Sequence, residues 1–469
     1  MVTSSAARVR ADLLPLLGSL GPGGRLPASR ALVAKLGVSA TTVQQALAAL
    51  VAEGLVETRP GAGTFVAARP DAAEHERPDT GWQDVTLSAS LVQTAGLDEM
   101  LRSPTGDGIL PMAVGFVATE LQADLRLPAA LARAARRPGG WLRPPVAGIP
   151  QLRSWFAGQL GAEAEDVIIT PGGQAALSTV IRAVVPAGES MLFATPSYPG
   201  ALAVARSHGL VPVPVPEDED GVRPDLLERA AARTRARLVY LQPTFGNPTG
   251  TGLAHHRRAE ILDIAHRHGM FVVEDDWARW LGHGAPVPPP LYADDRHGHV
   301  ITVNSLTKVV APSLRVGAIT ARGQVAARIA ALRMVDDLFV SGPLQEAAVE
   351  VVTAPGWAVY CRRLSRLLGA RAAALSSELR AQLPELPFRP PKGGTSLWLG
   401  LPTGVDDAAV ARRALAHGVT VTAGRHHLAG DQPETWLRLS YSGLPEADYP
   451  EAVRRLARAV ADVSAGAGQ

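Results

Sequence analysis

Strand-like apolar segments alternate with helical segments through the middle of the chain. This alternation predicts an α/β fold, with a mostly parallel sheet and helices on both of its faces. Ligands of such sheets bind beyond the carboxyl ends of the strands. The predicted strands are DVIIT (166–170), SMLFAT (190–195), ARLVYLQ (236–242), MFVVED (270–275) and HVITVNS (299–305), with helices at 174–185, 199–208 and 255–268.

The chain is too long for a single hydrophobic core, and its 469 residues predict two or three domains. Residues 323–380 have a helical pattern, and residues 388–460 mix short strands (SLWLGL, VTVTA, WLRLSY) with helices, as in a smaller appended domain. The predicted domains are a head at 1–68, a proline-containing charged linker at 69–86, and a body at 87–469 with a large part at about 100–325 and a small part at about 385–460.

The head has the pattern of three helices followed by a hairpin. Residues 4–18 have helical spacing, and LPASRALVAKLG begins a second helix with Ser29 as its expected N-cap and Gly37 as its end. VSATTVQQALAALVAEGLV begins a third helix with Ser39 as its N-cap, after only a short turn. VETRPGAGTFVAA then gives two β-prone segments around a Pro-Gly-Ala-Gly turn. Together these features predict a winged helix-turn-helix.

Charge is distributed unevenly between the head and the rest of the chain. Residues 1–70 carry seven cations and three anions, a net charge of +4, which leaves −2 for the remainder. A basic head on an acidic body favours DNA binding, although a small protein-interaction module has the same outline. The predicted DNA contacts are Thr41, Thr42, Gln44 and Gln45 to bases and Arg30 and Arg59 to phosphates, with Ser39, Gly61 and Gly63 completing the set.

Composition narrows the class of protein further. Cys361 is the only cysteine, so the sequence predicts no disulfide, no cysteine-rich metal site and no bound metal. The chain has no apolar run of 18 residues or more, and its first residues lack the apolar core of a signal peptide. We therefore expect a cytoplasmic protein.

Lysine is scarce in this chain. Among 46 basic residues only Lys35, Lys308 and Lys392 are lysines. Arginine can replace lysine at most surface positions but cannot form a Schiff base, whereas a partly desolvated lysine can. Lys308 lies in NSLTKVVAPSLRVG, directly after a predicted strand. We therefore interpret Lys308 as a reactive amine rather than a surface lysine.

Other polar residues fall at the same predicted strand ends. TPGGQAAL places backbone amides at a helix N-terminus, where anions bind, and Asp275 ends a buried strand. Alone, each feature has an ordinary explanation. The glycines of TPGGQAAL form a common turn, Asp275 can cap the next helix, and the nearby segment QPTFGNPTG can be simply a rigid loop. Together, a phosphate cradle, an amine, a carboxylate for a ring nitrogen and an aromatic residue match the needs of pyridoxal 5′-phosphate (PLP).

The motifs SLTKVVAPSLRVG, FGNPTG and VVEDDW resemble those of fold-type I aminotransferases, over residues 85–460. With RLPASR, GVSATTVQQAL and GAGTFV in the head, the whole chain resembles the MocR subgroup of GntR-type transcription regulators. The resemblance implies that Lys308 binds PLP as an aldimine, Asp275 pairs with the pyridine nitrogen, Asn247 hydrogen-bonds the ring hydroxyl and Tyr198 stacks on the ring. It implies that Arg438 binds an α-carboxylate, and that the phosphate is held by Gly173, Gln174, Ser305 and Arg315, with Thr307.

Two positions depart from the pattern of this family. Trp277 stands where the family usually has a tyrosine that helps to hold the ring hydroxyl, and an indole N–H can donate but cannot accept or ionise. Ala40 stands where these recognition helices commonly have arginine, so one DNA contact is missing. Trp277 remains in the predicted cofactor site.

The function implied is a PLP-dependent, DNA-binding transcription regulator. It would sense PLP, an amino acid or an amine through an aldimine at Lys308, and would act as a homodimer without significant turnover. One alternative is a true aminotransferase that carries a regulatory head. Another is a PLP-binding protein whose head docks onto a protein.

Overall fold

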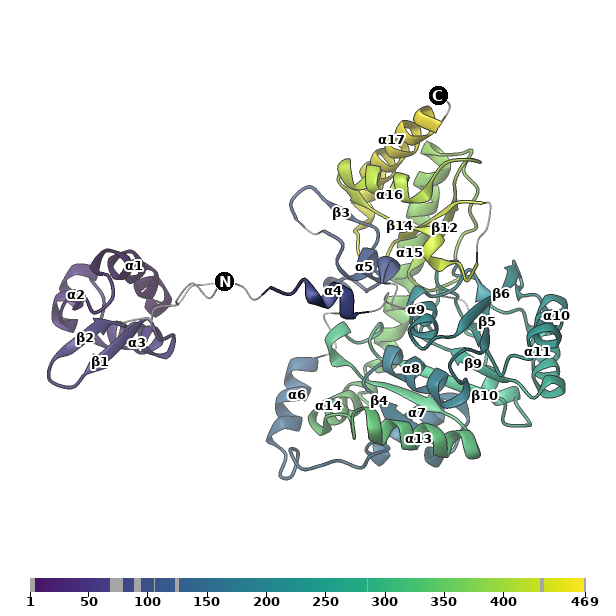
Figure 1. The fold of residues 1–469 in the computed structure, drawn as a ribbon, viewed down its shortest axis with the longest axis horizontal. Coiled ribbons are helices and arrows are strands. Elements are labelled where there is room, and N and C mark those ends of the chain that lie inside the picture. The colour runs from purple at the N-terminus through teal and green to yellow at the C-terminus, as the bar shows by residue number, and fades with distance from the viewer. Residues whose placement is uncertain are drawn as a thin grey trace. The chain divides into compact units, whose positions relative to one another are not determined.

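The computed structural model describes residues 5–67, 79–87, 94–104, 106–122, 126–284, 286–430 and 434–467. The chain divides into two compact units, Met1–Ala89 and Ser90–Gln469 (Figure 1). Most of the predicted linker, residues 69–78, lies outside the described residues. Its last part contains a short helix, α4 (Trp82–Thr86).

The first unit is built as a winged helix-turn-helix, as predicted. Three helices, α1 (Ser5–Leu20), α2 (Ser29–Leu36) and α3 (Ala40–Ala52), enclose a small apolar core. Strands β1 (Val56–Arg59) and β2 (Gly63–Val66) pair antiparallel as the wing.

The helix ends of the first unit confirm two predicted boundaries and correct a third. Gly37 ends α2 in the left-handed conformation, and the Ser39 hydroxyl caps α3 by accepting from the Thr42 amide at 3.1 Å. The prediction that Ser29 caps α2 was wrong. Ser29 is the first residue inside that helix, and the cap position belongs to Ala28, which makes no side-chain bond. Ala28 is extended, with φ −56° and ψ 147°, and its carbonyl accepts from the Ala31 and Leu32 amides, so the helix begins one residue earlier than a Ser29 cap would place it.

The second unit contains a sheet of eight strands in the order β4-β11-β10-β9-β8-β5-β6-β7. The pairs from β10 through β6 are parallel, and β11 runs antiparallel to both neighbours. The mostly parallel prediction is therefore confirmed. The strands are β4 (Val167–Thr170), β5 (Ser190–Thr195), β6 (Val211–Asp218), β7 (Gly221–Val222), β8 (Leu238–Leu241), β9 (Phe271–Asp275), β10 (Val300–Ser305) and β11 (Gly317–Thr320).

Strand β6 was absent from the sequence prediction, and its sequence, VPVPVPED, contains three prolines. Proline cannot donate to a ladder and normally argues against a strand. Here the prolines occupy alternate positions, so the three missing N–H groups all fall on the same edge of the strand. The opposite edge, which faces β5, keeps its donors: the Val211 amide donates to Glu189 O at 3.0 Å.

Helices cover both faces of this sheet. One apolar cluster joins the sheet to α8 (Gly173–Val184), α9 (Pro199–Ser207) and α13 (Gln324–Asp336). A second cluster joins it to α10 (Pro224–Thr234), α11 (His255–His268) and α12 (Leu291–Asp294). Successive residues of β5 alternate between the clusters: Met191 and Phe193 face one, Leu192 and Ala194 the other.

The small part has a three-stranded sheet, in the order β12-β15-β14. An earlier segment joins it, because β3 (Leu110–Pro111) pairs parallel with β13 (Val419–Thr420). The remaining strands are β12 (Ser396–Gly400), β14 (Thr422–Ala423) and β15 (Trp436–Ser440). The remaining helices are α5 (Ala95–Leu101), α6 (Leu127–Arg136), α7 (Pro150–Leu160), α14 (Gly342–Val352), α15 (Trp357–Gln382), α16 (Asp407–Ala416) and α17 (Tyr449–Ala467).

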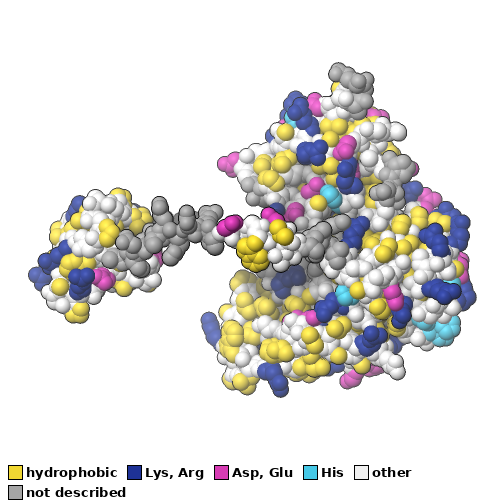
Figure 2. Space-filling view, viewed as in Figure 1, with side chains coloured by type: hydrophobic (Ala, Val, Ile, Leu, Met, Phe, Trp, Pro, Cys, Tyr) yellow, Lys and Arg dark blue, Asp and Glu magenta, His cyan; other side chains and the backbone are white. Residues whose placement is uncertain are grey.

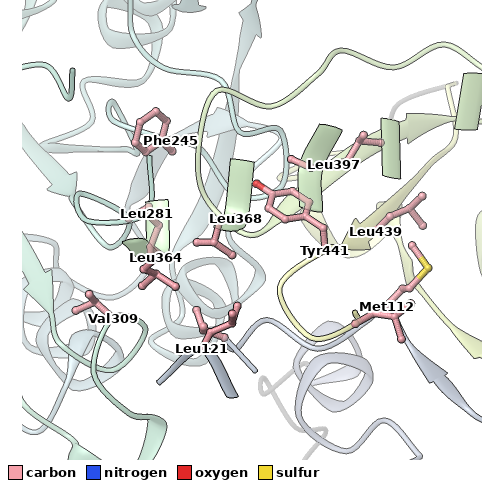
Figure 3. Packing of buried hydrophobic residues seen from close by; sticks show 14 of the residues in the cluster. Met112, Leu121, Phe245, Leu281, Val309, Leu364, Leu368, Leu397, Leu439 and Tyr441 are labelled. Atoms are coloured by element: carbon pink, nitrogen blue, oxygen red, sulfur yellow. The ribbon is translucent and has the colours of Figure 1, made fainter. Parts of the chain in front are cut away.

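The long helix α15 ties the two parts of the body into one core (Figure 3). Its Leu364 and Leu368 pack in the same buried cluster as Leu281 of the large part and Leu397 and Tyr441 of the small part. Burial of this kind contributes about 25 cal/mol per Å² of apolar surface. The large and small parts of the body therefore share one hydrophobic core.

Candidate functional site

One cavity of about 350 Å³ collects the predicted cofactor residues at the carboxyl ends of the strands. All eleven predicted positions line it: Gly173, Gln174, Tyr198, Asn247, Asp275, Trp277, Ser305, Thr307, Lys308, Arg315 and Arg438. Residues that the sequence did not single out complete the wall: Leu97, Met100, Leu101, Gly115, Phe116, Leu177, Gln242 and Thr395.

Lys308 follows β10 and points its amine into this cavity. Its Nζ donates to Gly115 O at 2.7 Å and lies 3.7 Å from the centre of the Phe116 ring. Burial lowers the pKa of Lys308 to about 7, and the positive charges of Arg438 and Arg315 act in the same direction. A large fraction of the amine is therefore neutral, and nucleophilic, at neutral pH.

We expect the rate at which Lys308 reacts with an aldehyde such as PLP to rise with pH up to about 7 and then level off. Only the neutral amine attacks, so the rate should rise about tenfold per pH unit below that value. Stopped-flow absorbance measures this directly. In Arg438→Gln one charge that lowers the pKa is gone, so the plateau should begin at higher pH. A wild-type plateau near the ordinary lysine pKa of 10.5 would contradict the burial argument.

Asp275 ends β9 and is held by two side chains from β8 and the loop after it. The Tyr240 hydroxyl donates to Asp275 Oδ2, and Gln242 Nε2 donates to the same oxygen at 2.9 Å. Burial raises the pKa of Asp275 to about 6, while these donors oppose that shift. Such a carboxylate can pair with a protonated heterocyclic nitrogen. Gln242 also accepts from the Asn247 amide at 2.8 Å, which orients the loop that carries Asn247.

The N-terminus of α8 forms an anion cradle with Arg315. The first amides of α8, from Gly173 onward, have no partner within the helix. Arg315 donates to Pro171 O at 2.9 Å and to Thr307 Oγ1 at 3.3 Å, which fixes its guanidinium beside that N-terminus. The Ser305 hydroxyl donates to Thr307 Oγ1 at 2.9 Å, so two hydroxyls lie beside the guanidinium.

The anion cradle requires a glycine at position 172 for two reasons: its backbone conformation, and the close approach of the Arg315 side chain. Its φ is +95°, and a Cβ added there would lie 2.7 Å from Arg315 Nη2. We expect Gly172→Ala to displace the Arg315 guanidinium and weaken PLP binding about tenfold, or about 1.4 kcal/mol. Absorbance titration measures this, with Gly188→Ala (φ +87°, no atom within 4 Å of its Cβ) as the matched control. Equal losses in the two variants would mean that backbone strain alone is responsible.

Arg438 lies on β15 and is almost completely buried, at 1% exposure. Its Nε donates to Asn247 Oδ1 at 2.9 Å and its Nη1 to Ala113 O at 3.0 Å. Burial lowers the pKa of Arg438 to about 10, so it remains charged at neutral pH. Within the described ranges, no carboxylate lies within ion-pairing distance of it. A buried cation without a counter-ion is costly, which points to an anionic ligand.

Tyr198 and Trp277 provide aromatic surface. Burial raises the pKa of Tyr198 to about 12, so its hydroxyl stays protonated. The Trp277 indole N–H donates to Phe245 O at 3.0 Å. Because that donor is already used by the backbone, Trp277 supplies shape to the cavity and cannot replace the hydrogen bond of a tyrosine to a ring hydroxyl.

The donor set fits PLP. The anion cradle suits its phosphate, Lys308 suits its aldehyde, and Asp275 suits its ring nitrogen. Asp275 is the one carboxylate among the described residues that line the cavity, so no negative charge opposes a phosphate at the cradle. Bound PLP would supply an electron-withdrawing ring, and these residues would hold and orient it.

The predicted DNA contacts lie on the surface of the first unit. Thr41, Gln44 and Gln45 are exposed on α3, whereas the Thr42 hydroxyl is engaged with Ser39 at 2.8 Å. Arg30 is exposed on α2. Figure 2 shows basic side chains at the end of the head that carries α2 and the wing.

The tip of the wing is shaped by glycines and by arginine contacts. Gly61 and Gly63 have φ of +75° and +115°, which the turn requires. Arg59 forms an ion pair with Glu57 and lies 4.7 Å from the centre of the Phe65 ring. Part of its charge is therefore neutralised before any phosphate arrives. Arg25, which the sequence analysis did not single out, packs against Gly63.

Two negative findings concern the described part of the chain. No group of three or more His, Cys, Asp or Glu side chains is placed to hold a metal ion. No helix there is both long and apolar enough to cross a membrane.

Fold and cavity together define a fold-type I, aminotransferase-like protein with a winged helix-turn-helix head. Residues 112–456 match the family of class I and II aminotransferases, and residues 5–66 match the gntR family of bacterial regulatory proteins. The chain therefore belongs to the class I and II aminotransferase family, and its two-part architecture is that of the MocR-type GntR regulators.

Individual relatives include both enzymes and regulators. The chain is 33% identical to 2-aminoadipate transaminase of Thermus thermophilus, over 79% of this chain and 95% of that protein. It is 28% identical to the probable rhizopine catabolism regulatory protein MocR of Rhizobium meliloti, over 96% of this chain and 91% of that protein. The crystal structure of LysN, the α-aminoadipate aminotransferase of Thermus thermophilus, complexed with N-(5′-phosphopyridoxyl)-L-leucine, has a TM-score of 0.76 and 32% identity, covering 82% of this chain and 99% of that one.

Proposed function

We propose that this protein is a PLP-dependent transcription regulator whose head binds DNA and whose body senses an amino acid, an amine or PLP itself. The observation that carries the proposal is that one cavity holds both the Lys308 amine and the buried Arg438 guanidinium. Lys308, with a pKa of about 7, is suited to covalent attachment, and Arg438 has no counter-ion among the described residues. This cavity belongs to a chain that also carries a winged helix-turn-helix.

The residues divide into five roles in this proposal. Lys308 attaches PLP as an aldimine, and Asp275 holds the proton of its ring nitrogen. Gly173, Gln174, Ser305, Thr307 and Arg315 hold the phosphate, while Tyr198, Asn247 and Trp277 surround the ring. Arg438 binds the carboxylate of an amino-acid ligand.

DNA binding and assembly complete the proposal. Two heads in a homodimer would read two half-sites of an operator in the cytoplasm. A ligand in the body that favours one arrangement of the heads would change DNA affinity by about 1–3 kcal/mol, enough to switch occupancy.

A spectral titration tests this function. The visible spectrum of the protein with PLP is followed while amino acids and amines are added, and DNA binding is measured in parallel. A sensor is expected to show a stable spectral change with its ligand and a change in DNA affinity. If PLP binds and no compound perturbs it, PLP itself is the signal. If PLP does not bind, the proposal fails.

A second candidate is a true aminotransferase with a regulatory head, favoured by the 33% identity to a transaminase. The same titration separates the two. An enzyme would convert the cofactor to its amine form, and a keto acid would restore the original spectrum. Steady release of keto acid from an amino acid would establish turnover.

We expect DNA binding to weaken steeply with salt, with a slope of about −0.9 in the log–log plot for each phosphate contact. Arg30→Ala should flatten that slope by about 1, and Arg59→Ala by less because Glu57 already pairs with it. Fluorescence anisotropy of the full chain on duplex DNA measures the slope. The exposed body residue Arg229 gives the control variant Arg229→Ala. Absence of DNA binding at low salt would favour a protein-docking head.

A further inference from the structure

Helix α5 forms an apolar wall of the ligand cavity. Leu97, Met100 and Leu101 line the cavity from this helix, and Met100 is buried at 6% exposure. Leu177 and Phe116 add further apolar surface from α8 and from the segment after β3. The wall is made by a helix that carries none of the residues assigned to PLP.

Met100 lies beside the two groups that hold an amino-acid ligand. A Cβ placed on Gly115 would lie 3.2 Å from Met100 Cε, 3.4 Å from Arg438 Nη2 and 3.7 Å from Lys308 Nζ. All three atoms therefore surround one point. A ligand's α-nitrogen goes to the position of the Lys308 amine and its carboxylate goes to Arg438. The side chain leaves from the same α-carbon, so it meets the Met100 wall.

The cavity offers no partner for a charged side chain. The charged residues among its described lining are Asp275, Lys308, Arg315 and Arg438, and each already has a role with the cofactor or the α-carboxylate. A second carboxylate or ammonium on the ligand would be buried against Leu97 and Met100 without a counter-ion. Burying an unpaired charge is far more costly than burying an apolar group.

Contacts on both sides hold α5 in place. Glu99 accepts from the Ala423 amide at 2.9 Å and pairs with His426 at 3.3 Å, both in the small part. A Cβ on Gly96 would lie 2.6 Å from His426 Cβ and 3.2 Å from Pro199 Cβ, so the helix packs closely against the large part as well. The apolar wall is therefore built before a ligand arrives.

We infer that the effector is an α-amino acid with an apolar side chain of about leucine or methionine size, selected by α5 through Leu97 and Met100. This inference rests on the proposed function, because it takes PLP at Lys308 and the carboxylate at Arg438 as given. It excludes dicarboxylic amino acids, whose second carboxylate has no partner, as preferred ligands. It also excludes ω-amino acids, because they have no carboxylate on the carbon that bears the amine and so offer no α-carboxylate to Arg438.

The test uses the full chain loaded with PLP. L-Leucine, L-methionine, L-glutamate, L-2-aminoadipate and 4-aminobutyrate are titrated against the visible spectrum. Leucine or methionine is expected to act at concentrations at least about tenfold lower than the charged ligands. Equal or better response to a charged ligand overturns the inference, as does the absence of any response. Failure of PLP to bind at all is a different result, which removes the proposed function instead.

Two variants of α5 test whether Leu97 and Met100 select the side chain of the ligand. Met100→Ala is expected to weaken the leucine response about tenfold, and to weaken it more than it weakens PLP binding. Leu97→Arg supplies the missing cation, so the preference should move toward glutamate and 2-aminoadipate. Arg102→Ala, on an exposed residue at the end of the same helix, is the matched control. If Leu97→Arg leaves the order of ligands unchanged while the protein still binds PLP, α5 does not select the side chain.

Discussion

Replacing Lys308 by alanine is expected to abolish covalent attachment of PLP while the fold persists. Lys308 is the buried amine in the cavity, and its main contact is a single hydrogen bond to Gly115 O. The anion cradle remains, so PLP should still bind without a covalent bond, with affinity lower by on the order of 100-fold, about 2.7 kcal/mol. Borohydride reduction followed by mass spectrometry measures the covalent adduct, and circular dichroism measures the fold.

The chain offers a matched control for this experiment. Lys392 is an exposed lysine of the body, and Lys392→Ala should keep the adduct in full. Because the chain has only three lysines, the modified peptide identifies the site almost without ambiguity. A reducible adduct in Lys308→Ala that vanishes in Lys392→Ala would reverse the assignment.

Arg438→Gln is expected to remove most of the response to amino acids and to leave PLP uptake within about threefold of wild type. A buried, charge-assisted contact to a carboxylate contributes about 2–3 kcal/mol, so the apparent affinity for an amino acid should fall roughly 100-fold. Glutamine keeps a neutral donor near Asn247, which limits the structural change. The spectral titration supplies the measurement.

Ligand chemistry provides the control for Arg438. An amine that corresponds to the amino acid without its carboxylate should bind wild type and Arg438→Gln equally. A similar loss for both ligands would show that Arg438 acts through the shape of the cavity rather than through its charge. An unchanged amino-acid response would mean that the effector has no carboxylate.

Several residues of the site were predictable because the signal was local in sequence. Lys308 stood out through the scarcity of lysine, and the strand-end positions of Asp275 and Asn247 followed from a parallel sheet. Their convergence in one cavity agrees with that reasoning. The role of each residue remains a prediction that the variants test.

The supporting residues could not be found in this way. Tyr240 and Gln242 reach Asp275 only because β8 pairs with β9, and that pairing is a property of the sheet rather than of either segment. Gly115 and Met100 precede Lys308 by about two hundred residues. They meet it because β3 pairs with β13 and because α5 packs against β14 and α9. The bond from Trp277 to Phe245 O likewise depends on tertiary packing.

Arg315 has a backbone conformation with a consequence for how the anion site works. Its φ is +51°, in the left-handed region that a residue with a side chain adopts at a cost of roughly 1 kcal/mol. Folding imposes that conformation, and the bonds to Pro171 O and Thr307 lock it, before any phosphate is present. The entropy of ordering the guanidinium is therefore lost during folding instead of during binding. The anion site is therefore preorganised for a phosphate. The backbone strain at Arg315 lowers the free energy of unfolding rather than the free energy of phosphate binding.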